Sequence, residues 1–391
     1  MSDYRTDPGS TFAAPLFSGK NVLVTGGTGS LGQVLVRRLL SGAHGRPASV
    51  TVLSRDEAKQ HDMRLTFNRL GTTSEDPIWR DSERLLRFRV GDVRDPASVA
   101  ESLACKDVVF HAAALKQVPT CEYFPTEAIS TNIQGAINLT RTIAAAAPGV
   151  KALIGISTDK ACWPVNVMGM SKALQERVLI SANIAAPGTR FMCCRYGNVL
   201  ASRGSVLPVF LDQIRHGGPV TITTRTMTRF LLSLETAVDT IIATYALGQA
   251  GEIFVPKVPA ARISTLAEVL IGDRPLDIVE TGIRPGEKIH EVLVARDEAS
   301  RTVERGGYYV VRPALPDLHA DSIPSGPPAL TREFASHQKL MSKAALTRML
   351  RESGYLPAAA ITARRIARPA TSLVARPARR ALSTTAANIV S

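Results

Sequence analysis

Two residues of opposite charge stand side by side where a short apolar segment ends. The segment 152–157 reads ALIGIS and is followed by Thr158, Asp159 and Lys160. A carboxyl group and an amine in such a place form a potential general acid and general base. In a parallel sheet, ligands bind at the carboxyl ends of the strands, so this position predicts a reacting centre. An ion pair at the mouth of a loop is the alternative interpretation.

Met168 and Lys172 follow the charged pair in a segment, 166–184, that is expected to be helical. They are four residues apart and therefore share one face of the helix. A thioether has no acid–base chemistry, so ordinary core packing explains Met168 equally well. Lys172 remains a candidate for binding a ligand at the same edge of the sheet.

A glycine-rich turn follows the apolar run 21–25 and precedes a helical pattern over 30–40. Glycines let the backbone turn tightly and approach a pyrophosphate, and the helix start offers free N–H groups. Because the turn lies between a strand and a helix, it predicts a dinucleotide site rather than a turn without a ligand. The residues expected to hold the phosphates are Gly26, Thr28, Gly29, Ser30, Leu31 and Gly32.

The next strand ends in Ser54, Arg55 and Asp56. An arginine here can pair with a ribose 2′-phosphate, which favours NADP, whereas Asp56 keeps NAD as the alternative. A solvated surface charge is the other interpretation of Arg55. Further cofactor contacts are expected after the third and fourth strands, from Asp92, Val93, Ala112, Ala113 and Ala114.

Short apolar runs alternate with helical patterns through the first 200 residues. This alternation predicts an α/β fold, a doubly wound parallel Rossmann sheet with helices on both faces. A smaller C-terminal substrate-binding lobe is expected to cover the carboxyl edge of the sheet. The expected strands are 21–25, 49–54, 88–90, 107–111, 152–157 and 191–196, with 252–256 as an edge strand; the expected helices are 30–40, 126–147 and 166–184.

The rhythm of the sequence predicts four regions. Residues 1–19 are expected to be loose, and 20–200 to form the NADP-binding Rossmann domain, rejoined by 230–257. Residues 201–312 are expected to form the substrate-binding lobe. Residues 313–391 form a C-terminal extension with one helix over 342–353 and a disordered Ala/Arg-rich tail.

Composition excludes several classes of protein. The formal net charge of +13 is partly due to arginines in the tail, which lacks the aromatic residues of a nucleic-acid interface. The tail is instead expected to be a flexible arm that touches anionic lipid or a partner. The five cysteines have no metal-ligand spacing, so we expect no metal. No run is long enough to span a membrane and no secretory signal is present, so the protein is expected to be cytoplasmic.

Several motifs together resemble a known family. The glycine turn, His111-Ala-Ala-Ala114 and Lys172 resemble extended short-chain dehydrogenases/reductases, although that superfamily has Tyr-x-x-x-Lys where this chain has Met168-x-x-x-Lys172. Further segments, found in order between Asn21 and Pro313, resemble the UDP-N-acetylglucosamine 4,6-dehydratases of polysaccharide biosynthesis, some of which carry Met. They are 54–57, 91–95, 111–119, 157–161, 195–199, 202–206, 227–230 and 282–291.

The resemblance implies an internal redox cycle. A hydride leaves sugar C4 for NADP⁺, Lys160 takes the C5 proton, Asp159 protonates the departing C6 hydroxyl, and the hydride returns to C6. Lys172 would bond the nicotinamide ribose. The 4-OH proton, normally removed by the missing tyrosine, is left to Asp159, Thr158 or a relayed water. The product is a UDP-4-keto-6-deoxy amino sugar, and the enzyme is expected to be a homo-oligomer.

The substrate, UDP-N-acetylglucosamine or a related UDP-sugar, needs cations for its diphosphate and a carboxylate for its ribose. Surface charges are the alternative interpretation of the candidates. They are Lys116, Asn198, Arg203, Val206, Arg229, Arg284 and Glu287.

Two other functions remain possible for this sequence. A nucleotide-sugar 4-epimerase would use C4 redox chemistry without an elimination pair, and Asp159-Lys160 speaks against it. A non-catalytic NADP-binding regulator would explain the missing tyrosine, but the retained Asp159, Lys160 and Lys172 speak against it.

Overall fold

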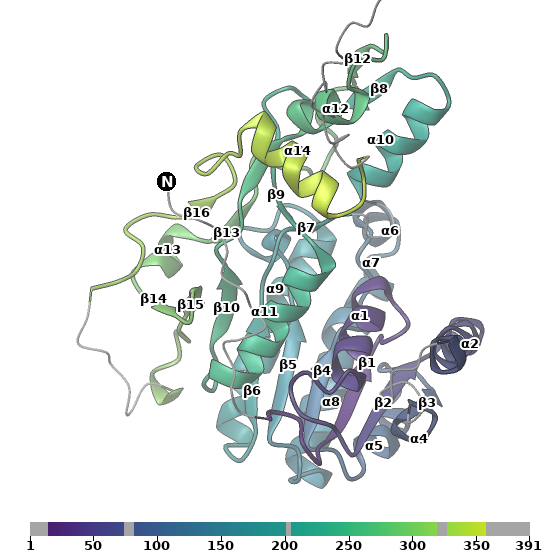
Figure 1. Cartoon of the computed structure of the whole chain (residues 1–391). Coiled ribbons are helices and arrows are strands. Elements are labelled where there is room, and N and C mark those ends of the chain that lie inside the picture. Colours follow the sequence, from purple (N-terminus) through teal and green to yellow (C-terminus); the bar gives the residue numbers. More distant parts are fainter. Residues whose placement is uncertain (1–14, 74–81, 201–204, 319–326, 357–391) are drawn as a thin grey trace, which may run out of the picture. The chain divides into compact units, whose positions relative to one another are not determined.

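The apolar segments of the first 200 residues form parallel strands of one sheet. The computed structural model describes residues 15–73, 82–200, 205–318 and 327–356 (Figure 1). The expected Ala/Arg-rich tail lies outside the described residues. Residues 15–19 were expected to be loose, and this is wrong: the Phe17 side chain is buried and its ring stacks on Tyr245, with centroids 5.1 Å apart.

The central sheet has the strand order β14-β15-β10-β6-β5-β4-β1-β2-β3. From β3 to β10 the neighbours are parallel, in the order of a dinucleotide-binding sheet, whereas β15 is antiparallel to both β10 and β14. The strand expected at 252–256 is therefore not an edge. The strands are β1 Asn21–Thr25, β2 Ser49–Ser54, β3 Leu86–Val90, β4 Val108–His111, β5 Ala152–Ile156, β6 Arg190–Cys194, β10 Ile253–Pro256, β14 Thr302–Arg305 and β15 Tyr308–Val311.

Helices cover both faces of this sheet, as the doubly wound pattern predicts. On one face α1 packs against α11, and on the other α8 packs against α5 and α9 (Figure 1). The helix expected over 126–147 is one helical run with a π segment, η2, in its middle. The bounds are α1 Ser30–Leu40, α2 Glu57–Thr73, α4 Ser82–Leu85, α5 Pro96–Leu103, α6 Val118–Tyr123, α7 Pro125–Ala128, η2 Ile129–Gln134, α8 Gly135–Ala146, η3 Asp159–Ala161, α9 Val167–Ala185 and α11 Leu234–Leu247.

A smaller lobe has its own apolar core, built from α10, β8, α12 and α14. Leu346 and Leu350 of α14 are buried in it, so the C-terminal extension contributes to the lobe. Conversely, β14 and β15 fall within the range expected for the lobe but belong to the sheet. The remaining elements are β7 Asn198–Val199, α10 Val206–Arg215, β8 Val220–Ile222, β9 Thr228–Leu232, β11 Ala260–Arg262, α12 Ile263–Ile271, β12 Ile278–Glu280, β13 Val292–Val294, α13 Arg296–Ala299, η4 Pro316–Leu318, β16 Phe334–Ala335 and α14 Lys343–Glu352.

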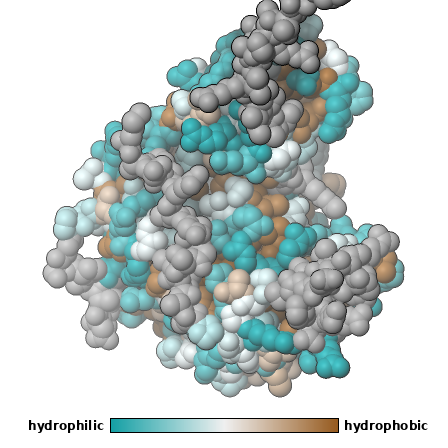
Figure 2. All heavy atoms as spheres, viewed as in Figure 1, coloured by the Kyte–Doolittle hydropathy of each residue, from teal (hydrophilic) through white to brown (hydrophobic). Residues whose placement is uncertain are grey.

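The described surface is largely polar on the face seen in Figure 2, with apolar residues between the lobe and the helices that cover the sheet. Among the described residues no helix is long and apolar enough to cross a bilayer. The same part of the chain holds no group of His, Cys, Asp or Glu side chains that could bind a metal ion.

Candidate active site

A cavity of about 1180 Å³ lies at the carboxyl ends of the parallel strands and is also lined by residues of the 284–287 loop. Most of the residues that the sequence predicts for the site line this cavity. All expected cofactor contacts line it: Gly26, Thr28, Gly29, Ser30, Leu31, Gly32, Ser54, Arg55, Asp92, Val93, Ala112, Ala113, Ala114 and Lys172.

The glycine turn brings backbone, rather than side chains, to one wall of the cavity. Gly26 has a φ of +69°, and a Cβ at this position would lie 2.7 Å from the backbone of Ala113. A Cβ on Gly32 would lie 2.5 Å from Gly27. Within the described part of the chain no side chain caps the first turn of α1, and that turn holds no acidic residue. The helix start therefore faces the cavity with free N–H groups and the positive end of its dipole, which fits a pyrophosphate.

The end of β2 supplies polar side chains next to this turn. The hydroxyls of Thr28 and Ser54 share a hydrogen bond of 3.0 Å. The Arg55 side chain is 58% exposed, and its Nη1 lies 3.9 Å from Oδ2 of Asp92. Burial acts to raise the pKa of Asp92, but hydrogen bonds and charge from Arg94 lower it overall. A carboxylate and a largely exposed guanidinium thus form a long ion pair at the cavity rim, where either could contact a nucleotide.

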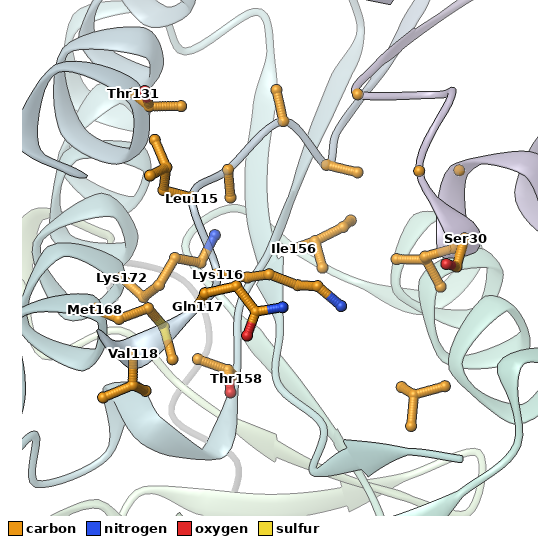
Figure 3. A pocket seen from close by; sticks show the side chains of 18 of the residues that line it. Ser30, Leu115, Lys116, Gln117, Val118, Thr131, Ile156, Thr158, Met168 and Lys172 are labelled. Carbon is orange, nitrogen blue, oxygen red and sulfur yellow. The ribbon is translucent and has the colours of Figure 1, made fainter. Parts of the chain in front are cut away.

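Thr158, Asp159 and Lys160 occupy the turn after β5, but they are not equally accessible. Thr158, seen in Figure 3, and Lys160 line the cavity, whereas Asp159 is fully buried and does not line it. The Thr158 hydroxyl donates to Asp159 Oδ1 at 2.8 Å, and Lys160 Nζ donates to the same oxygen at 3.1 Å. Within the described residues Asp159 Oδ2 accepts no hydrogen bond. Burial raises the pKa of Asp159 despite the adjacent ammonium group.

A second buried carboxylate, Glu291, faces Lys160 from the loop before β13. Its Oε1 lies 3.4 Å from Lys160 Nζ, and its Oε2 lies 3.3 Å from Lys288 Nζ. Arg229 of β9 lies behind the carboxylate, with Nε 3.8 Å from Oε1. For Lys160, burial acts to lower the pKa, but the charges of Asp159 and Glu291 outweigh it and raise the pKa. We call these five residues the Lys160 cluster.

Met168 and Lys172 point into the cavity from one face of α9, as their spacing predicts (Figure 3). Lys172 Nζ donates to Oε1 of Gln175 at 2.6 Å. Burial lowers the pKa of Lys172 to about 8. Met168 therefore lines the cavity and also packs in a small buried cluster with Cys121 and Ala128, and it brings no group that could transfer a proton.

The expected substrate residues divide between wall and interior. Lys116, Asn198, Arg284 and Glu287 line the cavity. Arg229 does not, because its guanidinium donates to the carbonyls of Thr228 and Ile289 and faces Glu291.

The two remaining substrate candidates lie near residue 205. Val206 begins α10 and is absent from the cavity wall, although its neighbour Ser205 lines it. Arg203 lies outside the described residues.

Residues without a predicted role complete the reacting side. Glu291 and Lys288 belong to the segment 282–291 that carried the resemblance, but no signal in the sequence pairs them with Lys160. Gln175 follows Lys172 by three residues, and this spacing could have indicated the contact. Asn166 caps α9 and donates to the carbonyl of Gly286 at 2.7 Å, which ties the 284–287 loop to that helix.

The sequence is similar to a known family and to named proteins. The family described as "polysaccharide biosynthesis protein" matches residues 22–313. The chain is similar to a protein of Rickettsia conorii named "UDP-glucose 4-epimerase", with 44% identity over 299 residues, 75% of this chain and 83% of that protein.

Two solved structures share the fold. Pen from Bacillus thuringiensis has a TM-score of 0.76 and 32% identity, covering 86% of this chain and 99% of Pen. A dTDP-glucose 4,6-dehydratase from Streptomyces venezuelae, solved with NAD and TYD bound, has a TM-score of 0.59 and 22% identity, covering 85% and 96%. At that identity the second likeness concerns the fold alone.

Proposed function

The chain belongs to the polysaccharide biosynthesis protein family, and from this premise we propose that it is a nucleotide-sugar 4,6-dehydratase acting on UDP-N-acetylglucosamine. It is a nucleotide-sugar modifying enzyme of the extended short-chain dehydrogenase/reductase superfamily. The finer assignment rests on one observation: the amine of Lys160 lines the same cavity as Met168, which replaces the superfamily's tyrosine, and it is hydrogen-bonded to the carboxyl group of Asp159 buried directly behind it.

A nicotinamide dinucleotide fits the cofactor half of the cavity, since the uncapped start of α1 and the close approach of Gly26 to Ala113 suit a pyrophosphate. When bound, this cofactor would accept a hydride from sugar C4 and return it to C6. Arg55 beside Ser54 supports NADP, and NAD remains the alternative. Lys172 would bond the nicotinamide ribose.

The chain's own groups would supply the proton transfers of the elimination. Proton transfer from the Lys160 ammonium to Asp159 Oδ1, 3.1 Å away, gives a neutral amine and a carboxylic acid in one step. These are the base and the acid that removal of the C5 proton and loss of the C6 hydroxyl need. The raised pKa of Asp159 supports this, because a buried carboxyl group favours its neutral form. The raised pKa of Lys160 acts against it, so the neutral pair is the minor form from which the reaction proceeds.

Thr158 offers a route for the Asp159 proton. Asp159 does not line the cavity, but the Thr158 hydroxyl, 2.8 Å from Asp159 Oδ1, does. A hydroxyl can accept one proton while donating another, so Thr158 can carry a proton between Asp159 and the sugar. If Asp159 is still ionised when C4 is oxidised, the same path can carry the 4-OH proton, which Met168 cannot take, to its carboxylate; Lys160 must then have released its own proton to solvent rather than to Asp159.

A 4-epimerase is the second candidate, and the relatives' names favour it over the dehydratase. Both reactions begin by oxidising C4. They separate afterwards, because epimerisation returns the hydride to C4 and leaves the C5–H bond intact. The residues favour the dehydratase, since an epimerase has no use for an acid–base pair at C5 and C6.

Incubation of the full-length chain with UDP-N-acetylglucosamine in deuterated water tests the proposal. We expect NMR to show a 4-keto-6-deoxy product with deuterium at C5. The C4 epimer without deuterium at C5 would replace the proposal with the epimerase. Unchanged substrate, with NADP bound, would instead indicate a regulator.

Two variants test the roles of the pair. Asp159→Asn and Lys160→Ala should each reduce turnover by about 10³-fold or more while NADP stays bound. Lys257→Ala is the matched control, since Lys257 pairs with Glu304 on the surface. Turnover that survives in Lys160→Ala would remove that residue from the mechanism.

A further inference from the structure

Lys160 has carboxylate partners on two sides, and only one of them belongs to the motif at the end of β5. Asp159 lies 3.1 Å and Glu291 3.4 Å from Nζ, on segments more than 100 residues apart in sequence. Both carboxylate side chains are almost fully buried, whereas the Lys160 side chain is 21% exposed. The amine therefore stands between a buried carboxylate pair and the open cavity.

Glu291 is held in place independently of Lys160. Lys288 Nζ lies 3.3 Å from its Oε2 and also donates to the carbonyl of Cys162 at 2.8 Å, just beyond η3. The backbone N–H of Glu291 donates to the Ser336 hydroxyl, whose partner is Thr228. The backbone bond and the Lys288 ion pair position the carboxylate relative to η3, the helix that carries Lys160.

Asp159 and Glu291 differ in charge once a proton has passed from Lys160 to Asp159. Once Asp159 has accepted the proton of Lys160, its carboxyl group is neutral and no longer attracts the amine strongly. Glu291 is surrounded by Lys160, Arg229 and Lys288, whose charges lower the pKa of Glu291 although burial acts to raise it. Glu291 thus stays ionised while Asp159 changes its charge.

We propose that Glu291 is a positioning residue that holds Lys160 Nζ at the cavity wall and stabilises the ammonium group formed when Lys160 takes the C5 proton. This inference rests on the proposed dehydratase function. The balance of the step is simple: the C5–H bond breaks, its proton becomes the third N–H of Lys160, and its electron pair stays on the sugar. Glu291 gains and loses nothing, because it acts only by its charge.

The charged groups around Lys160 decide the direction of the expected pH effect. They are Asp159 beside it, Glu291 and Lys288 from the loop before β13, and Arg229 from β9. Glu291→Gln removes one negative charge from this set and leaves both cations. The ammonium form of Lys160 is then less stable, so Lys160 should lose its proton at a lower pH.

Two measurements on Glu291→Gln test the inference. Lysines are ¹³C-dimethylated and the Lys160 signal, assigned by its loss in Lys160→Arg, is titrated by NMR. Its midpoint should fall by about 1–3 pH units, the range for loss of an opposite charge within a few ångströms. With UDP-N-acetylglucosamine, kcat should fall about 10- to 100-fold, because the lost placement of Nζ at the cavity wall outweighs the larger neutral fraction of Lys160. KM should change less than about twofold, since Glu291 does not line the cavity.

Controls separate this role from general stability. Glu304→Gln removes a surface carboxylate paired with Lys257 and should change neither measurement. Glu291→Asp keeps the charge and should recover part of kcat and most of the titration midpoint. If Glu291→Gln does not fold, Glu291→Asp carries the test alone, because its shorter side chain should still lower the midpoint measurably.

The outcomes also separate this inference from the proposed function. An unchanged Lys160 midpoint in the Glu291 variants, with wild type producing the deuterated 4-keto-6-deoxy sugar, overturns the inference alone. Wild type producing only the C4 epimer overturns the dehydratase, and the titration still measures whether Glu291 acts on Lys160. A lowered melting temperature with an unchanged midpoint and unchanged kcat would reduce Glu291 to a structural role.

Discussion

Two buried charge clusters connect the end of the sheet to the segment 288–298, and they differ in how completely their polar atoms are bonded. In the first, Arg195 at the end of β6 lies between Glu176 of α9 and Glu298 of α13. Arg195 donates to both oxygens of each carboxylate, at 2.6–2.9 Å. The Ser157 hydroxyl adds a bond of 2.5 Å to Glu176 Oε1. The charged groups in this Arg195 cluster are at most 3% exposed.

The Lys160 cluster also joins buried carboxylates to basic side chains, but it is left open. Its contacts to Glu291 are 3.3–3.8 Å, Lys160 reaches the cavity, and Asp159 Oδ2 accepts no hydrogen bond from the described residues. Unsatisfied buried polar groups lower stability, so native proteins retain them chiefly where they have a use. The closed cluster joins structural elements, whereas the open one has the accessible amine and the unbonded carboxylate oxygen that the proposed proton transfers need.

The largest expected loss of stability comes from a variant that breaks the Arg195 cluster. Arg195→Met leaves two buried carboxylates without their cation, which should lower the free energy of unfolding by about 3–5 kcal/mol. Lys160→Met opens the other cluster, where Asp159 can take up a proton and water can enter from the cavity, so the loss should stay below about 2 kcal/mol. Chemical denaturation of both variants at pH 7 measures the difference.

For activity the order of the two variants should be reversed: the variant that loses less stability should lose more turnover. Lys160→Met should lose turnover while remaining folded, whereas Arg195→Met should keep turnover per folded molecule at a temperature where it is folded. Equal losses of stability in the two variants would contradict the distinction between a closed and an open cluster. Arg225→Met, at an exposed pair with Glu280, is the control and should change stability little.

Lys172 is a third buried cation to compare with Arg195 and Lys160. Its hydrogen-bond partner is the neutral amide of Gln175 rather than a carboxylate. Its pKa is lowered by burial from 10.5 to about 8. Between these two values the unfolded chain binds more protons than the folded chain, so stability rises with pH across this window and not outside it. The contribution amounts to about 3 kcal/mol, since each pKa unit corresponds to ~1.4 kcal/mol.

The measurement compares wild type with Lys172→Met from pH 7 to pH 10.5. The free energy of unfolding of wild type, minus that of the variant, should increase by about 3 kcal/mol over this range. Groups common to both proteins cancel in the difference. A flat difference would mean that Lys172 keeps an ordinary pKa in the folded protein.

The cofactor half of the site could be predicted from sequence because its contacts are local. The glycine turn and the residues after β2, β3 and β4 need only short-range order and a parallel sheet, and every one of them lines the cavity. The strand pattern likewise predicted the sheet from β1 to β6. What it missed, the antiparallel β14 and β15, depends on short strands with no distinctive period.

The reacting half could be predicted only in part, because its contacts join distant segments. Lys160 and Lys172 were recognised as chemistry-bearing, but the partner Glu291 lies 131 positions after Lys160. Arg229 was expected on a diphosphate for its charge, and the structure pairs it with Glu291 instead. A charged residue type predicts that a partner exists, whereas only the folded chain decides which partner it is.

The smallest expected effect concerns Arg55, an exposed charge at the rim of the same cavity. Its side chain is 58% exposed, and its ion pair with Asp92 is long, with 3.9 Å between Nη1 and Oδ2. Arg55→Ala should therefore change the free energy of unfolding by less than about 0.5 kcal/mol. If Arg55 binds a 2′-phosphate, its loss should raise the dissociation constant of NADP about tenfold and leave that of NAD within about twofold. Calorimetric titration of both cofactors, with Arg225→Ala as the control for an exposed arginine, measures the ratio. An unchanged NADP affinity would remove Arg55 from the site and favour NAD, the alternative that Asp56, also on the cavity wall, supports.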